Sequence, residues 1–265
     1  MSMFQSGARS SVSRVARRLA ALRRLKLSGG AVLSLSLSLS LWGGCGAAGP
    51  GGTGGPGDPT PMQSPGTTAQ LGQKQTGDGT YYGATGGGAC SYDPSPGNLM
   101  VAAMNAPQYQ NSQACGTCID VTGPKGTITI RIVDLCPECK SGDLDLSEQA
   151  FVLIADKAAG RVPISWVPVA CQVSGPISIR FKEGSSQWWM AVQVRNSKLP
   201  IKKIELQKSG SWVALEQQSY NYYVMSSMPG PGPFTFRITS TTDQQITESG
   251  VVLKDAQVVQ GTQQF

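Results

Sequence analysis

Apolar and polar residues alternate in short runs through the last third of the chain, a pattern typical of β-strands. Turn-forming pairs such as Gly184-Ser185 and Ser209-Gly210 separate these runs. The strands predicted by this pattern are 177–181, 189–194, 201–206, 212–215, 220–224 and 234–238. Strands at these intervals favour a β-sandwich, which we expect over residues 174–265.

Shorter apolar runs separated by glycine fill the preceding segment and also indicate strands. The runs are 80–82, 118–121, 128–133 and 162–170. One helix is expected from Ser147, because a serine N-cap is followed by Glu148 in the first turn and by Phe151, Ile154 and Ala155 on one apolar face. Residues 77–173 are therefore predicted to form a mainly β domain with one or two short helices.

The first 44 residues have the pattern of a signal peptide. Residues 1–26 contain seven Lys and Arg residues and no acid, and the apolar run 31–42 that follows is too short to span a bilayer. Residues 45–76 are rich in Gly, Pro and Thr and lack the large apolar side chains that a folded core needs. We expect export, removal of 1–44, and a flexible linker over 45–76.

The net charge of the chain changes when the predicted signal peptide is left out. The chain has 22 Lys and Arg residues against 16 Asp and Glu, but seven of the bases precede Cys45, so 15 bases and 16 acids remain. The basic pI of about 9.0 belongs mostly to the leader, and nucleic acid is not an expected partner. Residues 174–265 carry nine bases and six acids; for most of these residues we expect solvated surface charge, and the alternatives are attraction to the acidic first domain or contact with an acidic wall polymer.

The odd one of seven cysteines is Cys45, which ends the apolar run and precedes small residues. This position is typical of lipidation, although Trp42 stands where bacterial lipoprotein signals usually have leucine. The alternative is ordinary cleavage nearby. We expect a secreted or cell-surface protein, and an outer-membrane lipoprotein if Cys45 is acylated. That lipid would be its only link to a membrane.

The other six cysteines all lie in the first predicted domain. They are Cys90, Cys115, Cys118, Cys136, Cys139 and Cys171. Export favours disulfides, while two Cys-x-x-Cys pairs leave a zinc site as the alternative, with two cysteines unexplained. The sequence does not choose a pairing. We expect disulfides and neither a metal nor another cofactor.

Five segments carry a resemblance to a known family. They are Gly-Thr-Tyr-Tyr at 79–82, Gly-Ala-Cys at 88–90, Val-Asp-Leu at 133–135, Gly-Asp-Leu-Asp-Leu-Ser at 142–147, and the long 182–196 segment around Trp-Trp. Residues 77–265 resemble microbial expansins. The resemblance implies a six-stranded double-psi β-barrel followed by an immunoglobulin-like β-sandwich that serves as a carbohydrate-binding module. It also implies the disulfides Cys90–Cys115, Cys118–Cys171 and Cys136–Cys139.

The resemblance places a polar groove on the barrel, formed by Thr80, Asp134 and Asp145, with Asp134 essential. Many members have an aromatic residue two positions after this aspartate, where this chain has Cys136. Alternative roles are a turn anchor for Asp134 and a backbone cap for Asp145. The candidates for stacking a sugar in the groove are then Tyr81 and Tyr82.

A flat aromatic platform is implied on the sandwich, formed by Trp188, Trp189 and Tyr220 with Lys182 nearby. Adjacent tryptophans on a regular strand would face opposite sides, so the alternative is that one belongs to the core. Tyr222 and Tyr223 compete with Tyr220 for its role. Lys182 has the alternative of a solvated surface charge.

The expected function is non-hydrolytic. Inverting glucanases need an acid and a separate base, and residues 83–86, where related enzymes carry the base, contain no carboxylate. Asp145 is expected beside Asp134, with no room between them for the attacking water. We therefore expect a monomer that binds cellulose and other plant cell-wall polysaccharide and competes for the hydrogen bonds between chains; the sequence leaves the preferred polysaccharide open.

Two alternatives remain. One is a peptidoglycan lytic transglycosylase of the rare lipoprotein A type, which usually carries a histidine in its first motif, whereas this chain has none. The other is an adhesin with an inert barrel, which would bind the wall without changing it.

Overall fold

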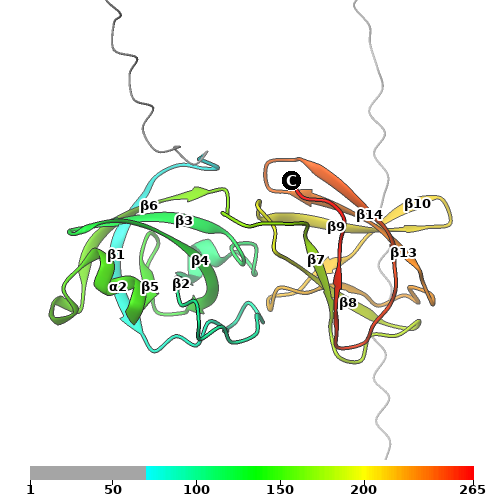
Figure 1. The fold of residues 1–265 in the computed structure, drawn as a ribbon, viewed down its shortest axis with the longest axis horizontal. Coiled ribbons are helices and arrows are strands. Elements are labelled where there is room, and N and C mark those ends of the chain that lie inside the picture. Colours follow the sequence, from blue (N-terminus) through cyan, green and yellow to red (C-terminus); the bar gives the residue numbers. More distant parts are fainter. Residues whose placement is uncertain (1–69) are drawn as a thin grey trace, which may run out of the picture. The chain divides into compact units, whose positions relative to one another are not determined.

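Six strands close into a barrel in the first half of the residues that the computed structural model describes, which are 70–265. Around the barrel the order is β1-β5-β2-β4-β3-β6 (Figure 1). The pairs β1/β5 and β2/β4 are parallel and the others antiparallel. The strands are β1 (Gln75–Tyr82), β2 (Val101–Asn105), β3 (Cys118–Gly123), β4 (Gly126–Cys136), β5 (Leu144–Ser147) and β6 (Val162–Val169). The predicted six-stranded barrel is confirmed.

The barrel core follows from alternation along its strands and from one helix. Ile130 and Ile132 of β4 point inward and are fully buried. Helix α2 (Glu148–Ile154) begins at the expected cap, where the Ser147 hydroxyl accepts a hydrogen bond from the Ala150 amide at 3.0 Å. Phe151 and Ile154, one turn apart, are also fully buried. The remaining helical segments are α1 (Ala106–Tyr109) and a 3-10 turn, Lys157–Ala159.

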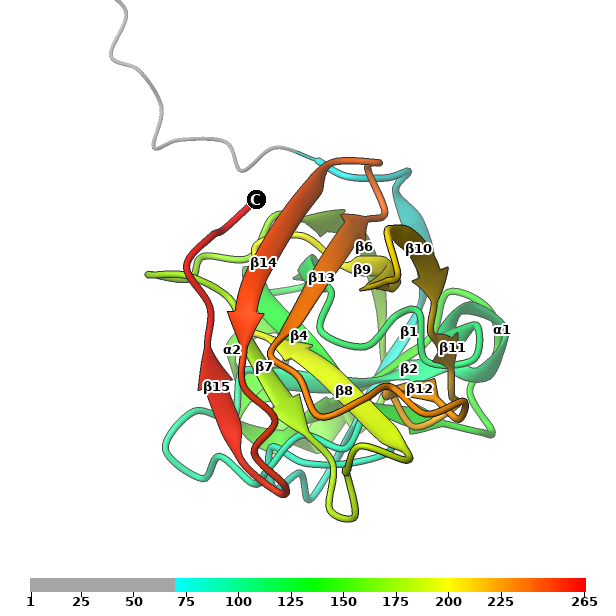
Figure 2. The ribbon, with the colours of Figure 1, turned by 90° about the vertical axis from the view of Figure 1, so that its right-hand side faces the viewer.

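Two sheets form the second domain (Figure 2), with strand orders β10-β9-β13-β14 and β11-β12-β8-β7-β15. Its strands are β7 (Ser178–Phe181), β8 (Met190–Arg195), β9 (Ile201–Lys208), β10 (Ser211–Ala214), β11 (Glu216–Gln217), β12 (Tyr223–Met225), β13 (Phe234–Ser240), β14 (Gln245–Val251) and β15 (Val258–Gln260). Phe181 and Val192 from one sheet pack in the same buried cluster as Leu206 and Phe236 from the other. The domain is the expected β-sandwich.

The structure differs from the expected boundaries at several points. Strand β1 begins at Gln75, and Gln70 forms an isolated bridge with Val169, so part of the expected linker belongs to the fold. Strand β8 begins at Met190 and β12 at Tyr223, each later than expected. The sequence pattern did not predict β2, β5, β11, β14 or β15. The predicted signal peptide, the lipidation site at Cys45 and most of the linker lie outside the described residues.

All six cysteines of the described chain are paired, and the pairing is the one that the resemblance implied. The disulfides are Cys90–Cys115, Cys118–Cys171 and Cys136–Cys139. These cysteines are therefore not zinc ligands. Among residues 70–265, no group of three or more His, Cys, Asp or Glu is arranged to hold a metal ion. Within the same residues, every helix is too short or too polar to cross a membrane.

The barrel and the sandwich lie in one compact unit and share hydrogen bonds. Tyr109 is buried, and its hydroxyl donates to the carbonyl of Ser219 at 3.0 Å. The Ser112 hydroxyl donates to the carbonyl of Gln218 at 2.7 Å. The end of α1 and the turn after it thus support the sandwich loop that leads to Tyr220.

Candidate functional site

A row of polar side chains crosses four adjacent strands of the barrel. Thr80 of β1 pairs in register with Asp145 of β5, and the Thr80 hydroxyl donates to Asp145 Oδ1 at 2.6 Å. Ala103 of β2 is in register with Asp145 on one side and with Asp134 of β4 on the other. The structure therefore brings together Thr80, Asp145 and Asp134, the three groove residues expected from the sequence.

The two carboxylates lie on strands β4 and β5, which pair with opposite edges of β2. Ala103 lies between Asp134 and Asp145, so their backbones are about 10 Å apart, two strand spacings. Burial raises the pKa of Asp145, and the hydrogen bond from Thr80 opposes that rise.

Asp134 is held by backbone amides at one of its carboxylate oxygens. Its Oδ1 accepts hydrogen bonds from the amides of Ala89 at 2.7 Å and of Leu135 at 2.8 Å. Gly88 approaches so closely that a Cβ there would lie 2.3 Å from Asp134 Cγ, which explains the glycine. Among residues 70–265 no hydrogen bond to Oδ2 is formed, and the Tyr82 side chain lies next to this carboxylate.

Strand alternation separates the two tyrosines that the sequence left as alternatives. The Tyr81 ring lies 4.9 Å from that of Phe151 and packs against the barrel core. The Tyr82 hydroxyl is itself buried and lies near both carboxylates: burial, followed by the charges of Asp134 and Asp145 and a side-chain contact with Asp134, raises its pKa. Tyr82 is therefore the groove tyrosine, and it is a hydrogen-bond donor at neutral pH.

The predicted platform residues lie in two loops of the sandwich. Trp188 is 63% exposed and Trp189 half-buried, and both precede β8. Because neither is on the strand, alternation does not force one of them into the core. Tyr220 is half-buried in the turn before β12, whereas its competitors Tyr222 and Tyr223 are buried.

Lys182 follows β7 directly and is half-buried. Its backbone amide bonds the Ala191 carbonyl at 2.9 Å, which fixes the start of the loop that carries the tryptophans. The sequence did not predict three features of the site: the bond from the Ala89 amide to Asp134, the close approach of Gly88 to that carboxylate, and the position of Ala103 between the two acids. The Gly-Ala-Cys segment was a signal for the first two, whereas the register that places Ala103 is not visible in the sequence.

A carboxylate held for hydrogen bonding on the barrel and an exposed tryptophan on the sandwich are features of a polysaccharide-binding protein. Two family models match the chain. Residues 101–166 match the lytic transglycolase model, and residues 172–252 match the expansin C-terminal domain.

Relatives identify the family. Expansin-YoaJ of Bacillus subtilis is 36% identical over 191 residues, covering 70% of this chain and 82% of the relative. Expansin-like protein 1 of Dictyostelium discoideum is 34% identical over 175 residues, covering 61% of each. The structure of the apo expansin of Clavibacter michiganensis matches with a TM-score of 0.69 and 35% identity, over 72% of this chain and 98% of that one. The chain belongs to the expansin family.

Family membership confirms the predicted class of function, a protein that binds cell-wall polysaccharide and loosens it without being an enzyme. It also confirms the fold that the resemblance implied, a double-psi barrel with a C-terminal β domain. A second Clavibacter michiganensis structure, of a mutant expansin in complex with cellohexaose, matches with the same TM-score and 34% identity.

Proposed function

We propose that this protein binds cellulose and related wall glucans across the groove and the aromatic platform, and separates the chains without cutting them. The observation that carries the proposal is the Asp134 carboxylate, whose Oδ1 is held by the Ala89 and Leu135 amides while Oδ2 accepts no hydrogen bond among residues 70–265. A carboxylate oxygen can accept a hydrogen bond from a sugar hydroxyl. The cellohexaose bound by a related expansin supports a glucan ligand.

The groove acts by competition for hydrogen bonds. A bond from a hydroxyl to a carboxylate is roughly twice as strong as one between neutral groups. A glucan hydroxyl that donates to Asp134 is therefore withdrawn from its bond to a neighbouring chain. Thr80 keeps Asp145 oriented at the far end of the row and has its own hydroxyl oxygen free to accept.

The platform holds the polysaccharide in place. Ring faces of Trp188, Trp189 and Tyr220 would stack on the C–H faces of successive sugars and release water from both surfaces. Lys182 would add a charge at the same edge. Stacking does not require a chain end or a flexible loop, so it suits a crystalline, extended ligand.

The case against hydrolysis rests on family membership and on the missing base. Residues 83–86, which follow β1, contain no carboxylate. Purified residues 70–265 should be incubated with cellulose, with plant wall and with peptidoglycan. We expect pull-down with cellulose and faster wall creep, with no soluble sugar; release of reducing sugar would refute the non-hydrolytic mechanism.

A lytic transglycosylase acting on peptidoglycan is the second candidate, because the model that matches the barrel carries that description. It predicts soluble anhydro-muropeptides in the peptidoglycan incubation. An adhesin predicts pull-down without wall creep. The same three incubations therefore distinguish all three functions.

We infer secretion through a signal peptide at 1–44, a linker from 45 to the start of the fold, and a monomer as the working state. Lipidation of Cys45 would place the protein on the outer membrane. Cys45→Ser should then move the native protein from the membrane fraction to the soluble fraction, and unchanged fractionation would leave simple secretion.

A further inference from the structure

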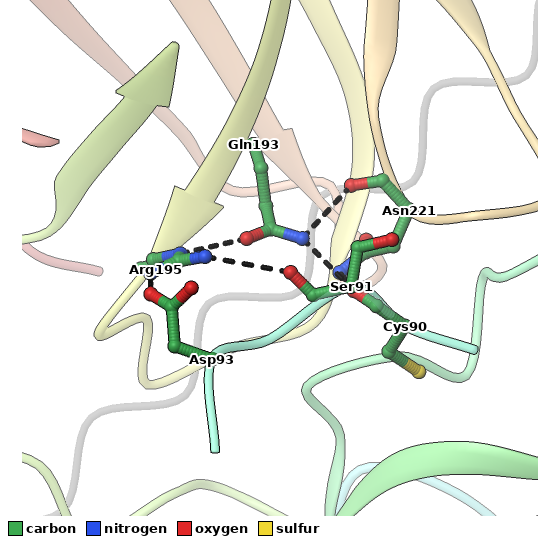
Figure 3. Close-up of polar contacts among 6 residues, drawn as sticks. All are labelled: Cys90, Ser91, Asp93, Gln193, Arg195 and Asn221. Atoms are coloured by element: carbon green, nitrogen blue, oxygen red, sulfur yellow. Dashed lines mark hydrogen bonds and ion pairs between the residues drawn. The ribbon is translucent and has the colours of Figure 1, made fainter. Parts of the chain in front are cut away.

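The barrel loop 88–93 is held by side chains of the sandwich (Figure 3). Gln193 of β8, fully buried, donates from Nε2 to the carbonyl of Cys90 at 2.9 Å. Asn221 donates from Nδ2 to the same carbonyl at 3.2 Å. Cys90 is itself fully buried, and both side-chain donors to its carbonyl, Gln193 and Asn221, come from the sandwich. Removing them would leave a buried acceptor unpaired.

Arg195, two residues after Gln193 on β8, completes the network. Its Nε donates to Gln193 Oε1 at 2.7 Å, which fixes the orientation of the amide so that Nε2 faces Cys90. Its guanidinium pairs with Asp93 at 2.5 Å and reaches the Ser91 carbonyl at 3.4 Å. The carbonyls of Cys90 and Ser91 and the side chain of Asp93 are thereby all bonded to residues of β8.

The other side of the same loop faces the groove. The Ala89 amide is one of the two donors to Asp134 Oδ1, and the backbone of Gly88 lies against that carboxylate. The Cys90 amide bonds the Val133 carbonyl at 3.1 Å, next to Asp134 in β4. The second donor, the amide of Leu135, belongs to β4 itself and does not depend on the loop.

We propose that Gln193, with Asn221 and Arg195, positions the groove carboxylate: these sandwich side chains fix loop 88–93, and the loop fixes Asp134 through the Ala89 amide. The proposal rests on the proposed function, because it assigns Asp134 the contact with glucan. Gln193 touches no sugar and is a positioning residue. The sandwich thus contributes to the groove as well as to the platform.

The test uses Gln193→Met in the protein, which keeps the length of the side chain and removes both hydrogen-bonding groups. Gln207→Met is the matched control, because Gln207 is exposed on β9 in the other sheet. Should Gln193→Met fail to fold, Asp93→Asn is the second variant. The Asp93 side chain is 65% exposed, and removing its charge weakens only the ion pair with Arg195.

Backbone NMR is the direct readout. We expect hydrogen exchange at the Ala89 amide to accelerate at least about tenfold in Gln193→Met and its proton resonance to shift, while the amide of Leu135 stays unchanged. Asp93→Asn should give the same effect with smaller size, and Gln207→Met none. An Ala89 amide that is unchanged in folded Gln193→Met would overturn the proposal, as would equal changes at Ala89 and Leu135.

Wall creep and cellulose pull-down provide the functional readout. Creep per molecule bound should fall several-fold in Gln193→Met, because Asp134 loses its positioning; dividing by the amount bound removes any effect on the Tyr220 loop, where Gln193 also bonds the Asn221 carbonyl. Unchanged creep in a variant whose Ala89 amide has shifted would also overturn the proposal. If the unmutated protein produces no creep, the proposed function fails, whereas the amide measurements still decide whether the sandwich positions Asp134.

Discussion

Replacing both platform tryptophans with alanine should weaken cellulose binding without destabilising the fold. Trp188 is 63% exposed and Trp189 half-buried, so most of the stacking surface is accessible before the ligand arrives. Two aromatic contacts of about 0.5–1.5 kcal/mol each amount to about 1–3 kcal/mol, and the water released adds to that. Because 1.4 kcal/mol corresponds to a tenfold change, the affinity should fall at least about tenfold.

A buried tryptophan in the barrel provides the control for stability. Trp166 is 4% exposed and donates from Nε1 to the Gly142 carbonyl at 2.8 Å. Trp166→Ala should cost about 3–5 kcal/mol, a fall in melting temperature of roughly 6–20 °C for a fold of this size, while each folded molecule still binds cellulose. The assay is a cellulose pull-down isotherm, run at several salt concentrations, beside thermal unfolding.

The reasoning is refuted if the Trp188→Ala, Trp189→Ala protein melts as early as Trp166→Ala and still binds cellulose normally when folded. Both tryptophans would then belong to the core. Little dependence on salt is expected, because ring stacking involves no net charge.

Three further outcomes are expected. Asp134→Asn should abolish wall creep and spare cellulose pull-down, since it neutralises the groove and leaves the platform; retained creep would contradict this. Removing Cys136–Cys139, which closes a loop of sequence separation 3, should cost about 2–3 kcal/mol less unfolding free energy than removing the disulfide of separation 53, as measured by denaturant titration. Burial raises the pKa of Asp145, so its contribution to stability is full below the unfolded pKa and is lost as pH rises through the folded pKa. Asp145→Asn should therefore gain stability relative to the unmutated protein between acidic and neutral pH, and a constant difference would oppose the assignment.

Strands with clear alternation could be predicted from the sequence, and strands without it could not. Strand β2, Val101–Asn105, is buried at all five positions, so it shows no alternation. Strand β14 contains Glu248, a charged residue that is 1% exposed. Its carboxylate accepts the backbone amides of Thr262 and Gln263, a contact from a distant segment that no local pattern reveals.

The sequence placed Thr80, Asp134 and Asp145 in one candidate site, but it did not show how their strands are arranged. Both Tyr81 and Tyr82 stayed open as groove candidates, and it is the observed strand β1 that puts Tyr82 on the same face as Thr80. The separation of Asp134 from Asp145 depends on the register of three strands that are not consecutive in the chain. Placement of the tryptophans depended on where β8 starts, and strand ends are the least predictable part of any element.

The contact between Tyr109 and the carbonyl of Ser219 has a consequence for recombining these domains. Tyr109 belongs to the barrel core, yet its hydroxyl completes the loop that presents Tyr220. A sandwich transplanted onto a cellulase or onto another barrel would lack this donor, and the hydroxyl of Ser112 as well. Chimeras should therefore carry α1 and residues 109–112 together with the sandwich. The segment that has to be transferred to keep the Tyr220 loop in place is longer than the sandwich domain itself.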